Sequence, residues 1–130
     1  MVRKEKPLSP HISIYKPQIS SVLSISHRLC GVLSFIGITF MMWWVLYMAY
    51  YSHSYSNSIV YSFFSSVVGQ LVLICWSFSF FLHFCTGIRY IFWDAGYGFS
   101  LPVMAKSGLA AVFTAFFLTS LVWLIYYLGL

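Results

Sequence analysis

The scarcest feature of this sequence is charge. Only 7% of its 130 residues are Asp, Glu, Lys or Arg, and only two of these are acidic, whereas soluble domains carry about 25% charged residues. No charged residue occurs between Leu29 and Ile88. So few charges cannot cover a surface in water, which excludes a water-soluble fold and makes lipid the expected solvent for most of the chain.

Cysteine is also scarce, and its placement excludes one cofactor chemistry. The three cysteines, Cys30, Cys75 and Cys85, lie in apolar segments, and no Cys-x-x-Cys-His motif occurs. Covalent attachment of a c-type haem is therefore excluded. We expect these cysteines to behave as small buried hydrophobic residues.

Polar segments divide the apolar sequence into three runs. Prolines at positions 7, 10 and 17 prevent a continuous helix over 1–20. The uncharged run that follows is longer than the roughly 20 residues that cross a bilayer, and the serine-rich stretch 52–58 interrupts it. We predict an all-α membrane protein. It has a single integral membrane domain over 1–130, with transmembrane helices at about 22–51, 59–92 and 106–130.

The seven basic residues predict an orientation. Five lie in or before the start of the first span and two flank the second connection, and these are Arg3, Lys4, Lys6, Lys16, Arg28, Arg89 and Lys106. Basic residues stay on the cytoplasmic or matrix side, so the N-terminus is expected inside and the C-terminus outside. The net charge of +5 is therefore a topology signal and does not form a nucleic-acid-binding face. Three helices have little interior, so a heteromeric helix bundle is expected.

One histidine lies inside the second predicted span. At roughly 100° per residue, His83 shares a helix face with Gly87, Tyr90 and Asp94. An ionisable group in a membrane span marks a functional site by default. An imidazole could bind haem iron, with the glycine leaving room for the porphyrin. A structural histidine bonded to a neighbouring helix and a proton relay are the alternatives.

A second polar cluster opens the first span. Ser24, His27, Arg28 and Gly31 have the i, i+3, i+4, i+7 spacing of one helix face. A hydroxyl, an imidazole and a guanidinium there suit a quinone carbonyl or a haem propionate. A basic anchor at the membrane surface, with serine as a cap, is the alternative.

The depths of the two clusters fit one cofactor. If the first two spans are antiparallel, Arg28 lies level with Ile88, and His83 lies about five residues, or 7–8 Å, deeper. A haem bound by His83 would then direct its propionates toward His27 and Arg28. This geometry disfavours His27 and His83 as two ligands of one iron. Asp94 is expected at the membrane edge, paired with Arg28 or Arg89 or supplying protons to a quinone.

Three motifs resemble a known family. They are Pro7–Lys16, Ser24–Gly31, and His83–Tyr90 with Trp93-Asp94, and together they resemble the cytochrome b subunit of succinate dehydrogenase of the alphaproteobacterial and mitochondrial type. The resemblance implies a three-helix subunit that is not an enzyme on its own. It would pair with a second small membrane subunit and anchor the flavoprotein and iron–sulfur subunits in the bacterial or mitochondrial inner membrane.

The resemblance also implies residue roles. It makes His83 one axial ligand of haem b, with the other supplied by the partner subunit. It places His27 and Arg28 near the haem propionates, and Ser24 and Arg28 against ubiquinone. Tyr90 departs from the family, which usually has histidine there, and a phenol cannot be cationic near neutral pH.

Two other functions remain open on the residues alone. A small ion or proton transporter could use His83 and Asp94 as a relay, although no acidic residue lies within a predicted span and no pair of broken helices appears. A purely structural anchor would leave the cofactor sites to its partner.

Overall fold

Four helices make up the described parts of the chain, residues 16–51 and 59–129 of a computed structural model. They are α1 (Ile19–Tyr50), α2 (Ile59–Ser65), α3 (Val67–Asp94) and α4 (Leu101–Leu128). By length and composition, α1, α3 and α4 can each cross a membrane. Their 28 to 32 residues span at least about 42 Å, more than the hydrocarbon core of about 30 Å. The predicted all-α architecture with three spans is confirmed.

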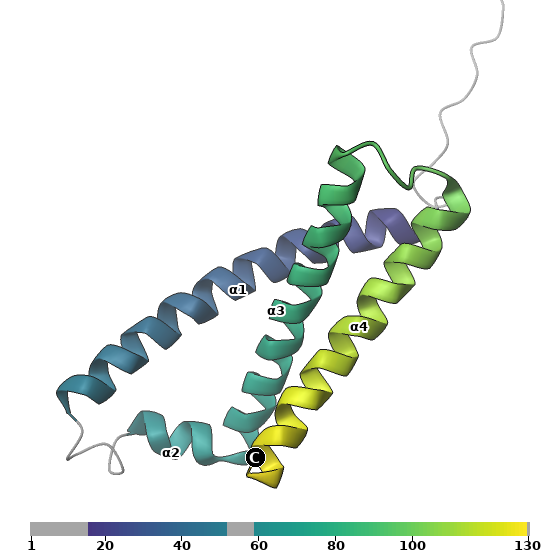
Figure 1. The fold of residues 1–130 in the computed structure, drawn as a ribbon. Helices are drawn as coiled ribbons and strands as arrows, with labels where there is room; N and C mark the ends of the chain where they lie inside the picture. The colour runs from purple at the N-terminus through teal and green to yellow at the C-terminus, as the bar shows by residue number, and fades with distance from the viewer. Residues whose placement is uncertain (1–15, 52–58, 130) are drawn as a thin grey trace, which may run out of the picture.

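The second predicted helix, 59–92, is divided, and the single-helix prediction is wrong here. The chain breaks at Ser66, whose extended backbone and side chain cap α3: the hydroxyl oxygen accepts a hydrogen bond from the Gly69 N–H at 3.2 Å. Gly69 is needed at this turn because a Cβ there would overlap the carbonyl of Phe63. As a result, α2 runs in a different direction from α3 (Figure 1).

The last helix begins at Leu101, five residues before the predicted start. Pro102 lies in its first turn, where the missing N–H needs no partner and the fixed φ suits a helix. The connection from α3 is therefore short, and Gly96 and Gly98 turn it with positive φ angles of 85° and 82°.

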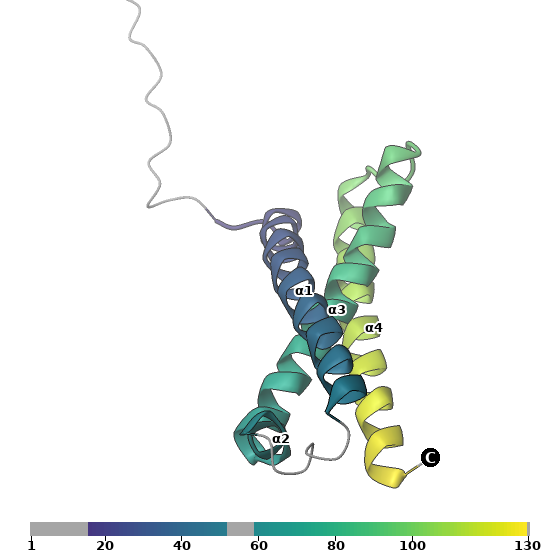
Figure 2. The ribbon, with the colours of Figure 1, turned by 90° about the vertical axis from the view of Figure 1, so that its left-hand side faces the viewer.

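The helix α3 is the centre of the bundle. It crosses α1 obliquely and runs alongside α4 (Figures 1 and 2). The residues of α4 that are buried against the bundle are all small, namely Gly108, Ala111, Ala115 and Thr119, which allows close approach of the helices. Large apolar side chains such as Phe35 and Trp43 are about 70% exposed, as expected of a surface covered by lipid or by another membrane chain.

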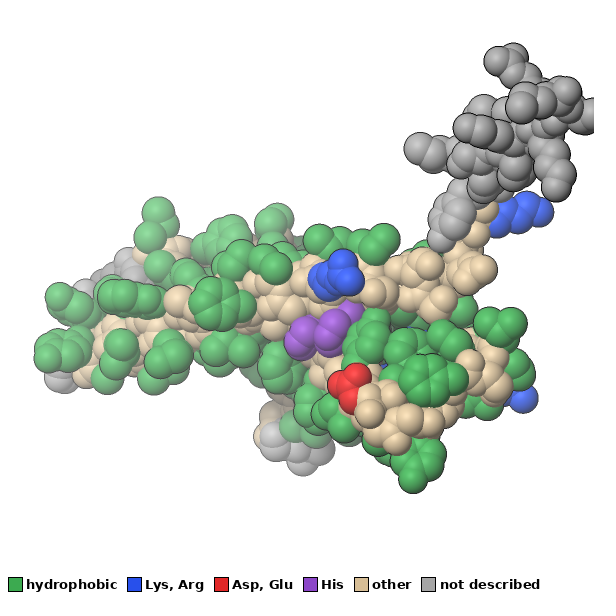
Figure 3. All heavy atoms as spheres, turned by 90° about the horizontal axis from the view of Figure 1, so that it is seen from above, with side chains coloured by type: hydrophobic (Ala, Val, Ile, Leu, Met, Phe, Trp, Pro, Cys, Tyr) green, Lys and Arg blue, Asp and Glu red, His purple; other side chains and the backbone are tan. Residues whose placement is uncertain are grey.

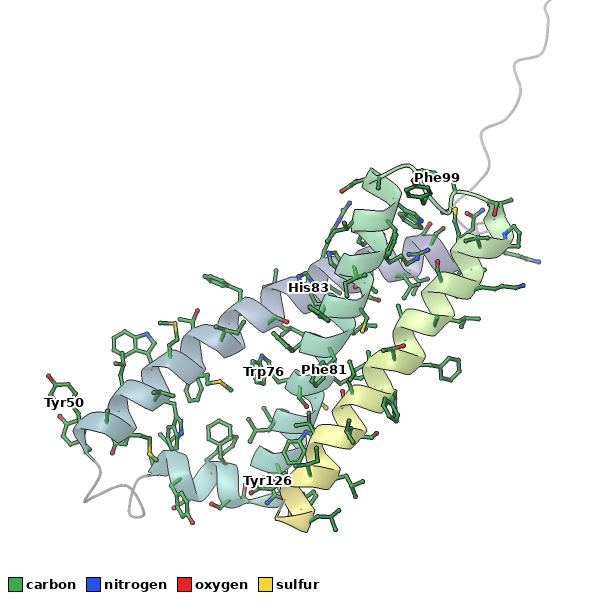
Figure 4. All side chains as sticks on the ribbon, viewed as in Figure 1. Tyr50, Trp76, Phe81, His83, Phe99 and Tyr126 are labelled. Carbon is green, nitrogen blue, oxygen red and sulfur yellow. The ribbon has the colours of Figure 1, made fainter. Side chains whose placement is uncertain are left out.

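A tryptophan secures the crossing of α1 and α3. Trp76 points from α3 toward α1 (Figure 4), and its indole N–H donates to the carbonyl of Leu33 at 3.2 Å. The ring occupies the space above Gly37, where a Cβ would overlap it. On the other side of α3, Trp123 of α4 donates to the hydroxyl of Ser77 at 2.9 Å.

The start of α1, the end of α3 and the start of α4 lie at one end of the bundle (Figure 1). Of the four described basic residues, Arg28, Arg89 and Lys106 belong to these segments, and Lys16 lies just before α1. We call this the basic end, and it is the end predicted to face the cytoplasm or matrix.

Candidate functional site

Two histidines meet near the basic end. The rings of His27 on α1 and His83 on α3 are stacked, with centroids 4.2 Å apart and planes 13° from parallel. Both side chains are half-buried. His83 projects from α3 toward α1 (Figure 4), and the histidines appear on the molecular surface when the bundle is viewed from above (Figure 3).

The main chain fixes the tautomer of His83. Its Nδ1 lies 3.0 Å from the carbonyl oxygen of His27. A carbonyl can only accept, so Nδ1 carries the proton and donates it. The Nε2 lone pair is then left available, with no hydrogen-bond partner among the described residues. An imidazole whose second nitrogen donates to the backbone in this way is typical of a metal ligand.

Thr86 holds the ring of His27 from the next turn of α3. Its side chain is completely buried, and its hydroxyl oxygen lies 2.8 Å from Nδ1 of His27. The same hydroxyl reaches the carbonyls of Leu82 at 2.6 Å and His83 at 3.2 Å. Because its single proton goes to a helix carbonyl, the oxygen accepts the proton of His27 Nδ1. Sequence reasoning missed this residue because threonine is unremarkable in an apolar helix.

Glycine makes room for the imidazole of His83. A Cβ on Gly31 would lie only 2.9 Å from Cε1 of His83, closer than carbon atoms pack at optimal separation. A Cβ on Gly87 would meet His27 Cε1 at an ordinary 3.6 Å. Both glycines therefore face the histidine pair, and Gly31 is the one that the contact requires.

The observed register differs from the predicted one. The prediction placed His27 level with Arg89, whereas it bonds to Thr86, an offset of three residues or about 4.5 Å. His27 consequently contacts His83 directly. Their lone pairs lie in nearly parallel ring planes, so the two imidazoles do not converge on a point between them.

The other predicted residues of α1 lie beside the histidines. Ser24 is half-buried and Arg28 is exposed, whereas His27 and Gly31 contact α3. The predicted shared face of α1 is therefore turned only partly toward α3. A basic side chain, the histidines and an acidic side chain are all visible when the bundle is viewed from above (Figure 3).

Comparison with known proteins establishes the family. Residues 2–122 match the succinate dehydrogenase/fumarate reductase transmembrane subunits. The chain belongs to this family. It is 38% identical over 122 residues to the succinate dehydrogenase cytochrome b556 subunit of Rickettsia prowazekii, covering 94% of both chains.

Two further relatives connect this transmembrane subunit to both bacterial and mitochondrial types. The succinate dehydrogenase cytochrome b560 subunit of Reclinomonas americana is 32% identical over 128 residues, covering 93% of this chain and 86% of the relative. The cytochrome b556 subunit of Paracoccus denitrificans is 28% identical over 112 residues, covering 85% and 83%. The resemblance noted from the three motifs is confirmed, as is the expectation of a subunit of a larger complex.

In this transmembrane subunit the side chain of Arg89 is hydrogen-bonded to α4. It is only 6% exposed, its Nε–H donates to the Ser107 hydroxyl at 3.0 Å and its Nη2 to the Met104 carbonyl at 2.9 Å. Its guanidinium also lies 3.9 Å from the ring centroid of Trp93. Arg89 therefore does not form the expected pair with Asp94, which is exposed at the end of α3.

Tyr90, where the resemblance led us to expect histidine, lies against His27. The ring of Tyr90 contacts that of His27, with centroids 4.8 Å apart. Its hydroxyl is buried and has no hydrogen-bond partner within 16–51 and 59–129. The predicted shared face of His83, Gly87 and Tyr90 is thus turned toward α1, with His27 as their common neighbour.

The donor set fits a haem better than a free metal ion. Over the described ranges, no group of three or more His, Cys, Asp or Glu side chains could hold a metal. A porphyrin supplies four nitrogen ligands itself, so one imidazole with a free Nε2 suffices from this chain.

Proposed function

We propose that this chain is a membrane-anchoring subunit of a succinate:ubiquinone oxidoreductase and binds haem b through His83. The observation that carries the proposal is the His83 imidazole, which lies in a membrane-length helix with Nδ1–H bonded to the His27 carbonyl and Nε2 available. The names of the relatives as cytochrome b subunits support the same reading.

In this proposal His83 Nε2 would bind the haem iron, and a second membrane subunit would supply a further ligand. The haem supplies one-electron redox chemistry, while the chain supplies position and charge. Arg28 is exposed and carries a positive charge one residue from His27, so its guanidinium would bind the anionic propionates, with His27 near them. Tyr90, against His27, makes that environment less cationic than a histidine would.

Ubiquinone would bind at the start of α1. Ser24 and Arg28 are four residues apart on this helix, so their side chains lie on one face. A hydroxyl and a guanidinium both donate hydrogen bonds to a carbonyl oxygen. Arg28 is exposed and free to reach a quinone head group at the membrane surface.

The partners would be the second membrane subunit, the iron–sulfur subunit and the flavoprotein. The exposed apolar faces of the three long helices suit contact with lipid and with the second membrane subunit. By relatedness the proposed setting is a bacterial inner membrane, since Rickettsia and Paracoccus proteins are among the relatives, and a mitochondrial inner membrane is the alternative.

The test is the haem spectrum of the assembled complex carrying His83→Ala. With the complex purified by a tag on this chain and normalised to flavin, we expect the b-type reduced-minus-oxidised signal to disappear because the iron loses its ligand from α3. His53→Ala, in the predicted connection between spans, is the matched control and should keep the signal. An unaltered spectrum in His83→Ala would refute haem binding by this residue.

A further inference from the structure

We propose that Thr86 is a positioning residue for the haem ligand, because its hydroxyl fixes the ring of His27 and His27 orients His83. This inference rests on the proposed function, since it concerns the residue that would hold the iron. It assigns Thr86 a role that the sequence motifs did not suggest.

The first link joins His27 to His83 through two contacts. The His27 carbonyl accepts the Nδ1 proton of His83 at 3.0 Å, and the His27 ring covers one face of the His83 ring at a centroid distance of 4.2 Å. The hydrogen bond selects the tautomer, and the ring contact limits rotation of the imidazole. Gly31 also limits movement of the His83 ring, because it lies so close to Cε1 of His83 that no larger residue would fit there.

The second link joins Thr86 to His27. The hydroxyl oxygen of Thr86 lies 2.8 Å from His27 Nδ1, and its own proton is given to the helix carbonyl of Leu82. The hydroxyl is thus an acceptor of fixed direction, since a β-branched side chain in a helix has few χ1 rotamers. Removing it would leave the N–H of His27 with no acceptor and release the ring.

The contacts that connect Thr86 to His83 through His27 begin and end on α3. Thr86 lies one turn after His83 on α3, so the same helix that carries the iron ligand also carries the group that holds its neighbour on α1. Removing a residue that orients a metal ligand commonly lowers metal affinity by about 10- to 100-fold. We expect Thr86 to act at the lower end of that range, because it reaches His83 only through His27.

The experiment compares Thr86→Val with Thr119→Val in the purified complete complex. Thr119 is a matched control: it is also buried, and its hydroxyl donates to the carbonyl of Ala115 four residues earlier, but it lies on α4. The readouts are the haem-to-flavin ratio after extended washing, the electron paramagnetic resonance signal of the ferric haem and its midpoint potential. Flavin and iron–sulfur content report assembly independently of haem.

We expect Thr86→Val to assemble normally, to retain haem on the order of tenfold more weakly, and to show an altered ferric haem signal. Thr86→Ser, which restores the hydroxyl, should return both readouts toward those of the unaltered complex. If Thr86→Val does not assemble, Thr86→Ala against Thr119→Ala makes the same comparison.

Haem retention, resonance signal and potential that match those of Thr119→Val would overturn the role of Thr86. That result would leave the proposed function standing, provided that His83→Ala still loses its haem. Haem kept by His83→Ala would instead refute the proposed function itself.

Discussion

Gly37→Ala is expected to loosen the crossing of α1 and α3. The added methyl group would overlap the indole of Trp76, which packs on Gly37 while donating a hydrogen bond to the carbonyl of Leu33. Either the indole leaves its place or the two helices separate. The crossing joins the same two helices as the histidine contact, so its loss should also displace the side chain of His83.

The size of the effect follows from three contributions. Forcing a methyl group into a filled contact costs about 1–3 kcal/mol, and losing the indole hydrogen bond costs about 1 kcal/mol. Alanine in place of glycine inside a helix gains about 1 kcal/mol. The net loss is about 1–3 kcal/mol, whereas in a Trp76→Leu background the first two contributions vanish and Gly37→Ala should stabilise by up to about 1 kcal/mol.

The assay is the rate at which the detergent-solubilised complex loses this subunit at a fixed temperature. Since 1.4 kcal/mol corresponds to a tenfold change in rate, Gly37→Ala should accelerate the loss by about fivefold to a hundredfold if the contact breaks before the transition state. In the Trp76→Leu background it should slow the loss or leave it unchanged. Equal acceleration in both backgrounds, or none in either, would refute the steric reasoning.

Three further substitutions test the proposed sites. Gly31→Ala places a methyl group 2.9 Å from Cε1 of His83, so the ring must move by about 0.5 Å to reach normal contact. We therefore expect the haem-to-flavin ratio to fall. A ratio equal to that of the unaltered complex would show that the ring adjusts freely. Arg28→Ala should reduce the rate of ubiquinone reduction at least tenfold, equivalent to about 1.4 kcal/mol, while succinate oxidation with a soluble electron acceptor is retained, and Ser24→Ala should act in the same direction. Full quinone reductase activity in both variants would exclude this location.

The three spans could be predicted from the sequence because lipid imposes a strong and simple pattern. The absence of charge from Leu29 to Ile88 and the serine-rich 52–58 stretch were sufficient to divide the first apolar run. The break at Ser66 could not be found by hydropathy, since α2 is as apolar as α3. Its signal is local: a serine three residues before Gly69, with the chain returning too close for any side chain.

The site was predicted in part for a similar reason. The helical period correctly placed His83, Gly87 and Tyr90 on one face of α3, because that depends only on 3.6 residues per turn. The direct contact of His27 with His83 depends on the register between two helices, which no single-helix pattern contains. Arg89 was assigned to the membrane surface because of its charge, whereas its partners lie on α4 and become visible only in the packed bundle.

The last helix contributes no side chain to the histidine pair, and its buried positions are occupied by Gly108, Ala111, Ala115 and Thr119. These positions require small side chains, because a bulky replacement would separate α4 from the helices that it packs against. Exchange among alanine, serine and threonine at positions 111, 115 and 119 would leave the histidine pair undisturbed, whereas a Cβ at Gly108 would overlap the Leu23 side chain of α1. The outward face of α4 can therefore change with the lipid or protein that covers it without moving the histidine pair.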